Sequence, residues 1–315
     1  MVFLIYRKSK LILTSQKGEA NNIENSPKIT RKGFLTGVGG LILDSVPFFA
    51  TGTVFTGMYY SSIEFQVFKR EIKISDLHKS FVGFRIVQIS DIHIGSLINE
   101  SYLKPTLEII QSLKPNCIFV TGDILDNSIQ YLNILGWYFA KLNEICSVYA
   151  ILGNHDHIDN SQKLIKTLKE TKTKVLVNEY AVIQKEKGYI NLIGLDYPMF
   201  HFTKRREISQ YWFRNIYKKI KYKEYPIIVL NHHPSEFEYL KNEKVDLVLS
   251  GHTHGGQIIF SKDRNSPFAL GSNFLKYYID YYKENNVQLY VNRGLGHWFP
   301  LRINCPAEIT LFELV

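Results

Sequence analysis

The sequence predicts an α/β fold: a four-layer α/β/β/α sandwich of two mixed sheets flanked by helices, with an N-terminal apolar membrane segment. Three observations lead to this prediction. From residue 84 onward, apolar runs of strand length alternate with segments whose apolar residues have helical spacing. After residue 175, short strand-like runs follow one another closely, which is typical of a second sheet. Earlier in the chain, residues 33–60 contain no Lys or Arg.

The predicted elements alternate regularly at first. Residues 84–90 and 116–121 are apolar enough for buried strands, and residues 102–113 have helical apolar spacing. A helix at 129–145, a strand at 147–152 and a helix at 159–170 follow. The remaining elements are short strands at 175–176, 181–184 and 190–195, a helix at 208–220, and strands at 226–230, 245–250, 258–259, 288–291 and 307–312. The close spacing between 175 and 195 indicates antiparallel strands of the second sheet.

The chain divides into a basic and polar N-terminal region at 1–80, with the apolar segment at about 33–60, and a second domain at 81–315. The segment exceeds the ~20 residues that cross a bilayer core. However, Asp44 within it costs about 2.5–3.5 kcal/mol at mid-span. Three interpretations therefore stay open: a spanning anchor, a segment lying in the interface, and a cleaved export signal.

The basic residues that precede the apolar segment bear on its orientation. Arg31 and Lys32 resemble part of a twin-arginine export signal, or they form the basic flank of a hydrophobic segment. Positive charge before a single span would place the N-terminus in the cytoplasm and the second domain outside. An interfacial segment would keep everything inside. A membrane is thus an expected partner, and its side stays open.

Composition narrows the classes of function. Hydrophobic residues make up 45% of the chain and charged residues 21%, which excludes a wholly disordered protein. Lys and Arg outnumber Asp and Glu by 38 to 29, and this excess favours an anionic partner such as a phosphate ester or an acidic membrane. No repeated basic-aromatic motif is present, so nucleic acid is not favoured as a partner. Three widely spaced cysteines argue against a disulfide framework and a cysteine zinc site.

Five polar clusters each follow a predicted strand. They contain Asp91 and His93; Asp123 and Asp126; Asn154, His155 and Asp156; His232 and His233; and His252 and His254. Ligand sites of open α/β sheets form at the carboxyl ends of strands, so clusters that are far apart in sequence converge there. Carboxylates, imidazoles and an amide oxygen are ligands for divalent metal ions. Each cluster alone is weak evidence, but the five together predict a metal site.

The spacing within the clusters supports this interpretation. Asp91 and His93 are two residues apart, so at the end of an extended strand their side chains point the same way. The same holds for His252 and His254, although a tight turn would divide them between two ions. Glycines begin three of the clusters and permit the turn that releases the strand into its loop: Gly122, Gly153 and Gly251.

The clusters resemble the pattern of the calcineurin-like metallophosphoesterase family: D-x-H, G-D-x-x-D, G-N-H-D/E, a later His, and G-H-x-H. The resemblance covers residues 84–315. It implies two divalent metal ions, Mn, Fe or Zn, that share a hydroxide for attack on phosphorus. It also implies a set of ligands, with one ion held by Asp91, His93 and His254, a second held by Asn154, His232 and His252, and Asp123 bridging both.

The resemblance further implies residues that act beside the ions. His155 corresponds to the acid that protonates the leaving group, oriented by Asp156, and Asp126 corresponds to a supporting group. The family's His-x-Pro pattern selects His232 as the ligand and leaves His233 at the edge of the site. Because the two histidines are adjacent, the choice between them stays open.

Within the family, the chain is similar to a bacterial membrane-linked branch through residues 85–93, 250–257, 291–296 and 304–310. That branch includes general phosphodiesterases and the UDP-2,3-diacylglucosamine pyrophosphatase of lipid A synthesis, of the chlamydial type. The resemblance implies cleavage of a phosphodiester or pyrophosphate bond in a phosphoester or lipid-linked nucleotide diphosphate, at the bacterial inner membrane. Two alternatives are a general phosphodiesterase of the cell envelope and a metal-binding membrane scaffold without turnover.

Three features outside the clusters have two interpretations each. Arg293 and Arg302 either contact a phosphate or form ordinary ion pairs. His297 and Trp298 lie in a loop that either grips substrate or packs against the domain. Basic runs such as residues 204–206 contribute to anion binding or are simply solvated faces.

Overall fold

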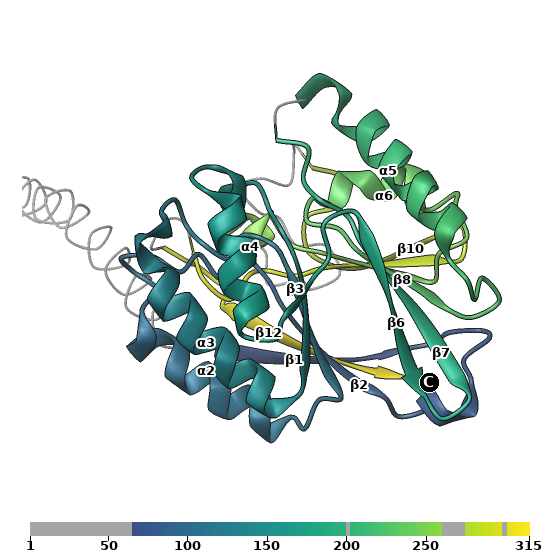
Figure 1. Cartoon of the computed structure of the whole chain (residues 1–315), viewed down its shortest axis with the longest axis horizontal. Coiled ribbons are helices and arrows are strands. Elements are labelled where there is room, and N and C mark those ends of the chain that lie inside the picture. The colour runs from purple at the N-terminus through teal and green to yellow at the C-terminus, as the bar shows by residue number, and fades with distance from the viewer. Residues whose placement is uncertain (1–64, 200–201, 260–274, 298–300) are drawn as a thin grey trace, which may run out of the picture. The chain divides into compact units, whose positions relative to one another are not determined.

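Two six-stranded sheets make up the centre of the described chain (Figure 1). The structure is a computed structural model, and it describes residues 65–199, 202–259, 275–297 and 301–315. The first sheet has the order β1 (Phe65–Ile72), β12 (Ala307–Leu314), β2 (Arg85–Ile89), β3 (Cys117–Thr121), β4 (Ser147–Ile151) and β5 (Lys174–Val175). The second has the order β10 (Asp280–Glu284), β11 (Val287–Val291), β9 (Leu247–Ser250), β8 (Ile227–Leu230), β7 (Gly188–Gly194) and β6 (Glu179–Lys185).

Both sheets are mixed, as the sequence predicted. In the first sheet β12 runs antiparallel to β2, and the other neighbours are parallel. In the second sheet the edge strands β10 and β6 run antiparallel to their neighbours, whereas β11, β9, β8 and β7 are parallel. Each sheet therefore has a run of four parallel strands, β2 to β5 in the first and β11, β9, β8 and β7 in the second, and the carboxyl ends of such a run share one edge.

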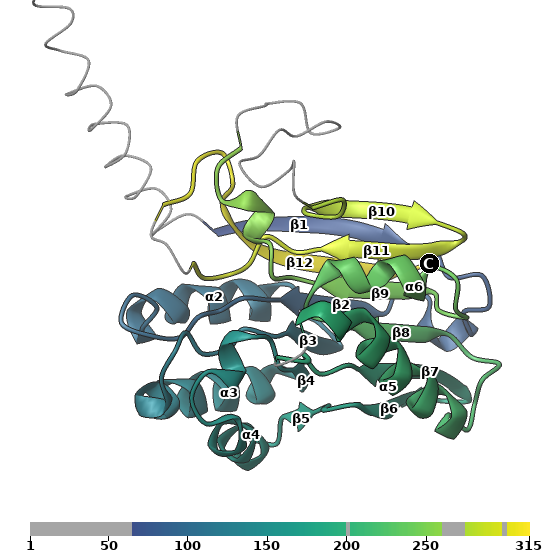
Figure 2. The same cartoon turned by 90° about the horizontal axis from the view of Figure 1, so that it is seen from above.

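Helices flank the two sheets. Helices α2 (Glu100–Ser112), α3 (Leu132–Ile145) and α4 (Ser161–Glu170) lie beside the first sheet, and α5 (Arg205–Lys219) and α6 (Phe237–Leu240) lie beside the second (Figure 1). Figure 2 shows the same separation from above. The predicted arrangement of two mixed sheets flanked by helices is confirmed.

The alternation of apolar side chains along the central strands explains the layers. In β2, Ile86 packs in the core that contains residues of both sheets, whereas Val87 packs in the core shared with α2, α3 and α4. In the second sheet, Ile228 belongs to the inner core and Val229 to the core shared with α5 and α6. Strands buried on both faces need apolar residues at successive positions, which is the pattern of the predicted strands.

Local signals fix the helix ends. The side chain of Asn99 accepts hydrogen bonds from the amides of Ser101 and Tyr102, so α2 begins two residues before its predicted start. Asn160 caps α4 in the same way. Helix α5 begins at Arg205, three residues before its predicted start at 208. Two residues of the basic run at 204–206 therefore belong to the first turn of this helix, which lies beside the site described below.

Four findings differ from the expected elements or boundaries. Strand β1 lies before residue 81 and pairs with β12 along its whole length, while the predicted boundary at 81 stays a prediction. Strand β5 joins the first sheet instead of the second. Strand β10 had no counterpart in the prediction. Ile258 forms an isolated bridge with Ile303 instead of a strand.

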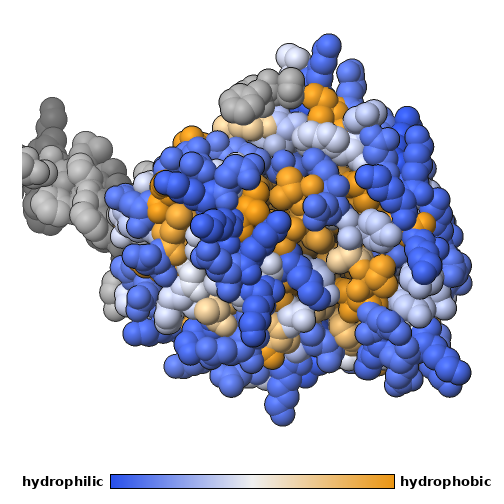
Figure 3. Space-filling model, viewed as in Figure 1, coloured by the Kyte–Doolittle hydropathy of each residue, from blue (hydrophilic) through white to orange (hydrophobic). Residues whose placement is uncertain are grey.

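The N-terminal apolar segment at 33–60 and Trp298 lie outside the described residues. Within the described ranges, no helix has both the length and the apolar character needed to cross a membrane. The face shown in Figure 3 is mostly hydrophilic, with apolar side chains in small groups. Val82, Leu97, Ile158 and Tyr211 are exposed large apolar residues, and such residues are ordinary when they occur singly.

Candidate metal centre

The five polar clusters lie directly after strands β2, β3, β4, β8 and β9, as the sequence predicted. The first three strands are parallel neighbours in one sheet, and the last two are parallel neighbours in the other. Their carboxyl ends converge, because side chains from all five loops come within hydrogen-bonding distance of one another. The sandwich thus brings residues from 91 to 254 into one site.

The first group of possible metal ligands contains Asp91, His93 and His254. Nε2 of His93 lies 3.1 Å from Nε2 of His254, and the latter atom lies 3.5 Å from Oδ1 of Asp91. All three side chains are buried. Two imidazole nitrogens and a carboxylate oxygen thus face one small volume, as expected for the ligands of one ion.

The second group contains Asp123, His232 and His252. Nε2 of His232 lies 3.2 Å from Oδ2 of Asp123 and 3.2 Å from Nδ1 of His252. Oδ1 of Asn154 lies 3.2 Å from the same Nε2, so the amide expected as a ligand belongs to this group. Oδ2 of Asp123 also lies 3.7 Å from Nε2 of His93, and this carboxylate therefore stands between the two groups.

The adjacent histidines have different surroundings. Nδ1 of His232 lies 2.8 Å from the carbonyl oxygen of Thr121, which directs Nε2 toward Asp123. His233 instead caps a short 3₁₀ helix, η5 (Pro234–Glu236), because its Nδ1 accepts from the amide of Ser235. The geometry therefore brings His232 into the second group and leaves His233 beside it.

The backbone of the site is unusual. Five of the seven expected ligands have positive φ, between 49° and 70°: Asp91, His93, Asp123, His252 and His254. Each such conformation costs a residue other than glycine about 1 kcal/mol or more, and it persists where surrounding contacts enforce it. Amides of Asp91 and His93 donate to the carbonyls of Gly122 and Asp123, which locks the first two loops together. Strain is thus concentrated at the candidate ligands.

Glycine is needed in the loops mainly for close approach. A Cβ on Gly153 would lie 2.1 Å from Oδ1 of Asp123, and one on Gly251 would lie 2.2 Å from Oδ2 of Asp91. Gly122 alone of the three has positive φ, at 91°. The sequence predicts a turn at all three glycines, whereas two of them make room for a carboxylate.

Burial and the neighbouring carboxylate of Asp123 determine the protonation of the imidazoles. Burial lowers the pKa of His93 and of His252 to about 3, and it lowers the pKa of His254 well below its usual value. Burial raises the pKa of Asp123, but the charge and hydrogen bond of His232 outweigh it, so the net pKa of Asp123 is lowered. Burial also lowers the pKa of His232, but the charge and hydrogen bond of Asp123 outweigh it and raise the net pKa to about 9, so His232 must release a proton before it can bind a cation. The three neutral imidazoles and the ionised carboxylate are donors that fit divalent cations.

His155 stands at the edge of the two groups. Its Nδ1 lies 2.7 Å from the carbonyl oxygen of Asp126 and 3.6 Å from Oδ1 of the same residue. Its amide donates to Oδ1 of Asp123, 2.9 Å away, and its side chain is half-buried. The loop after β4 thus presents this imidazole beside Asp123 with one ring nitrogen already held.

Asp156 does not orient His155, which corrects the expectation from the sequence. Its Oδ1 accepts from the amides of Ile124 and Leu125, and its Oδ2 accepts from the amide of Gly153. This buried carboxylate ties the loop after β3 to the loop after β4. The carbonyl of Asp126 is what holds the imidazole of His155.

The two arginines flagged by the sequence have structural partners. Nε of Arg293 lies 3.4 Å from Oε2 of buried Glu308, an ordinary ion pair. Arg302 is itself buried and donates to four main-chain carbonyls, those of Arg293, Gly294, Gly296 and Cys305. In the described part of the chain no carboxylate pairs with Arg302. His297, also flagged, is buried, and its ring contacts that of Tyr102.

Sequence reasoning missed Arg205 and Tyr197, which line the second group. The ring of Tyr197 stacks near that of His252, with 6.4 Å between centroids. The guanidinium of Arg205 donates to the hydroxyl of Tyr197 and to Oε1 of Glu236. The only signal in the sequence was the basic run at 204–206, which by itself indicates a solvated face.

Two mixed sheets with carboxylates and imidazoles at their shared strand ends define a class, the metal-dependent phosphoester hydrolases. Comparison with known proteins gives the family. The profile described as calcineurin-like phosphoesterase matches residues 84–256. The chain belongs to the calcineurin-like phosphoesterase family, as its motifs indicated, and it is a hydrolase.

Relatives that are similar over about three quarters or more of this chain support the assignment. The chain is 30% identical over 302 residues to the uncharacterized metallophosphoesterase YkuE of Bacillus subtilis, which covers 91% of this chain and 98% of that protein. It is 27% identical over 244 residues to phosphodiesterase YaeI of Escherichia coli, covering 74% and 82%. It is 25% identical over 297 residues to UDP-2,3-diacylglucosamine pyrophosphatase LpxG of Chlamydia muridarum, covering 76% and 85%.

Proposed function

We propose that the chain is a two-metal phosphoesterase that cleaves a phosphodiester or diphosphate bond. One observation carries the proposal: Oδ2 of Asp123 lies 3.2 Å from Nε2 of His232 and 3.7 Å from Nε2 of His93, and so belongs to both ligand groups. A carboxylate in that position can be shared by two ions. The half-buried imidazole of His155 lies beside it, where a leaving group would depart.

The proposed ligands are the seven expected from the sequence. Asp91, His93 and His254 would hold one ion, Asn154, His232 and His252 the other, and Asp123 both. This mixture of nitrogen and oxygen donors fits Mn, Fe or Zn. When bound, such ions supply charge that stabilises a phosphoryl group and lower the pKa of an attacking water.

His155 is the proposed proton donor. Because Nδ1 lies 2.7 Å from the carbonyl of Asp126, it is the nitrogen that carries a proton in the neutral ring, and Nε2 is left to face substrate. In the doubly protonated ring Nε2 gives its proton to the departing oxygen, so the leaving group departs as an alcohol or a phosphate monoester instead of an oxyanion. Asp156 acts indirectly, because it holds the loop that carries His155.

As substrate we propose a lipid-linked nucleotide diphosphate, of which UDP-2,3-diacylglucosamine is the leading case, at the bacterial inner membrane. The chlamydial relative supports this choice by its name. A zebrafish relative, 26% identical over 258 residues, is named as a transmembrane protein with a metallophosphoesterase domain. The apolar residues 33–60 and the formal charge of +9 suit an acidic lipid partner.

Two assays, performed one after the other, test the proposal. The purified chain should contain divalent metal and hydrolyse bis(p-nitrophenyl) phosphate with Mn²⁺; if neither is found, the chain is a scaffold and the enzymatic proposal is lost. Membranes that contain the chain should then release UMP from UDP-2,3-diacylglucosamine. If simple diesters are cleaved but no UMP forms, a general phosphodiesterase of the cell envelope replaces the lipid-linked substrate.

A further inference from the structure

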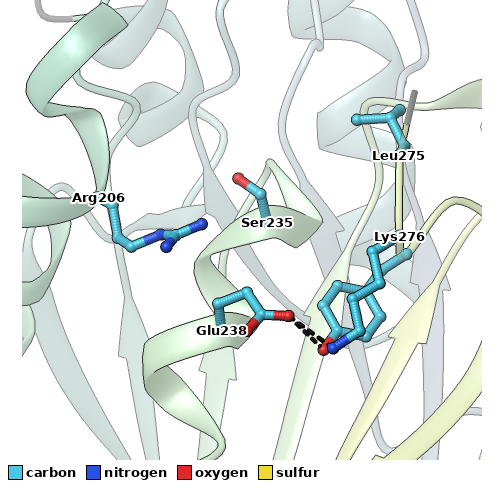
Figure 4. A pocket seen from close by; sticks show the side chains of 6 residues that line it. Arg206, Ser235, Glu238, Leu275 and Lys276 are labelled. Carbon is cyan, nitrogen blue, oxygen red and sulfur yellow. Dashed lines mark hydrogen bonds and ion pairs between the residues drawn. The ribbon is translucent and has the colours of Figure 1, made fainter.

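A cavity of about 280 Å³ lies beside η5, between helices α5 and α6 and the segment that begins at residue 275 (Figure 4). It is lined by Arg206, Ser235, Glu238, Leu275, Lys276 and Tyr277. Sites that enclose a whole ligand measure about 300–1,000 Å³. This cavity is therefore large enough for one part of a substrate and too small for all of it.

The cavity lies near the second ligand group, with the side chains of Arg205 and His233 between them. Ser235 lines the cavity, and its Oγ accepts a hydrogen bond of 2.7 Å from Nη2 of Arg205. The same Nη2 lies 3.4 Å from Nδ1 of His233, whose ring packs 4.3 Å from that of His252. The contacting side chains of Ser235, Arg205 and His233 thus connect the cavity to His252, a proposed metal ligand. A substrate bound at the metal centre has a neighbouring space in which to place its far end.

Most charges around the cavity cancel. Lys276 pairs with Glu238 at 2.8 Å and with Glu284 at 3.3 Å. Lys241 pairs with the same two carboxylates at 3.1 and 2.8 Å. Two cations and two anions therefore form one balanced network, and Glu238 contributes no net repulsion to an incoming anion.

Arg206 is the uncompensated charge of the cavity. Figure 4 shows its side chain extending from α5 toward Ser235. Its guanidinium has no hydrogen bond or ion pair within the described ranges, in contrast to that of Arg205 next to it. Leu275 and the ring of Tyr277 add apolar surface to the lining. One free guanidinium with an apolar wall is suited to an anionic group carried by an organic molecule.

We propose that this cavity is a subsite for a second anionic group of the substrate, apart from the phosphate at the metal centre, and that Arg206 is its charged contact. The inference rests on the proposed phosphoesterase function. It favours substrates with a second anionic group, which is either the second phosphate of a diphosphate or a separate phosphate or carboxylate.

A matched pair of substrates tests the subsite. Thymidine 5′-(p-nitrophenyl phosphate) is compared with the same ester that carries a 3′-phosphate, and the ratio of their kcat/KM values measures the preference for the second anion. We expect the wild-type chain to prefer the 3′-phosphorylated ester. Arg206→Ala should reduce that preference about tenfold, as loss of a charged hydrogen bond does, and Arg206→Lys should keep part of it.

Arg214→Ala is the control, because Arg214 is an exposed arginine on the same helix and pairs with Glu243 at 3.6 Å. The control should keep the full preference. A wild-type chain without preference, or an equal loss in Arg206→Ala and Arg214→Ala, would overturn the subsite. If neither ester is hydrolysed, the proposed function fails, and equilibrium binding of thymidine 3′,5′-bisphosphate against thymidine 5′-phosphate still decides the subsite: unchanged affinities in Arg206→Ala reject it.

Discussion

Nη2 of Arg302 lies 3.3 Å from Nδ1 of His254, on the side of the imidazole away from the ligand group. The same guanidinium donates to three carbonyls within residues 293–296. In turn, the amide of Gly296 donates to the carbonyl of Asp91. One buried arginine therefore links the loops that carry two of the three proposed ligands of the first ion, and the geometry of those loops depends on its hydrogen bonds.

Replacing Arg302 tests this link. Arg302→Met leaves several buried carbonyls without donors, which costs about 1–3 kcal/mol for each unsatisfied group, and it frees the loop behind Asp91 and His254. We expect the variant to lose the first ion while the second group keeps its own. Elemental analysis of purified Arg302→Met should show about half the metal content of the wild type. The metal content of Arg302→Lys should lie between those of Arg302→Met and the wild type.

Arg293→Met is the control for Arg302. Arg293 pairs with buried Glu308 and stacks over Phe68, so its loss should lower the free energy of unfolding. Its side chain does not contact the ligand groups, and the metal content should stay near that of the wild type. Equal metal loss in the two variants would show that Arg302 contributes stability alone.

Asp123→Asn tests the shared carboxylate. Oδ2 of Asp123 faces both His93 and His232, so a neutral amide there should weaken both ions and abolish turnover. Asn154→Ala removes a donor from the second group only, and should lower metal content less. The measurement is metal content after dialysis against a chelator, together with hydrolysis of bis(p-nitrophenyl) phosphate. Retention of both ions by Asp123→Asn would contradict the bridging role.

His155→Ala separates proton donation from metal binding. Its ring is held by the carbonyl of Asp126 and is not needed in either proposed ligand set, so metal content should stay near normal. The rate should fall about 10²–10⁴-fold for an ester with a poor alcohol leaving group. With p-nitrophenolate, which departs without a proton, the fall should be much smaller. A similar fall for both esters would argue against the role of acid.

The convergence of the candidate ligands was predictable because their signal is local. Each ligand follows an apolar strand within two or three residues, and a sheet places all such strand ends at one edge. The choice of His232 over His233 was not local. It depends on the carbonyl of Thr121, which lies 111 residues away in the chain and fixes Nδ1.

The contacts that hold the candidate ligands and the edge strand in place were not predictable either, because they also join residues that are far apart in the sequence. The family resemblance implies that Asp156 orients His155, but the oxygens of Asp156 accept from amides of the loop after β3, about thirty residues earlier. Strand β1 was missed because Phe65–Ile72 has three consecutive charged residues at 69–71 and pairs with β12, the last strand described. Such partners are chosen by tertiary packing, which sequence periodicity does not record.

A last prediction concerns pH and the contact between two loops of the site. Nε2 of His157, in the loop after β4, lies 2.8 Å from Oδ1 of Asp196, in the loop after β7, and both side chains are mostly buried. Burial lowers the pKa of His157, but the hydrogen bond and charge of Asp196 outweigh it, and the net pKa is raised above 6.5. The folded chain therefore holds this proton more tightly than the unfolded chain does.

The stabilisation from this pair should be complete below pH 6.5 and lost as the pH rises through the raised pKa of His157. We expect the free energy of unfolding of the wild type to exceed that of His157→Gln by about 1 kcal/mol near pH 6, and by less near pH 9, as measured by urea denaturation. In an Asp196→Asn background the same substitution should give a difference that no longer depends on pH. If the difference in free energy of unfolding between the wild type and His157→Gln instead grows as the pH rises, His157 is neutral in the folded chain. That result would contradict a charged contact between the two loops.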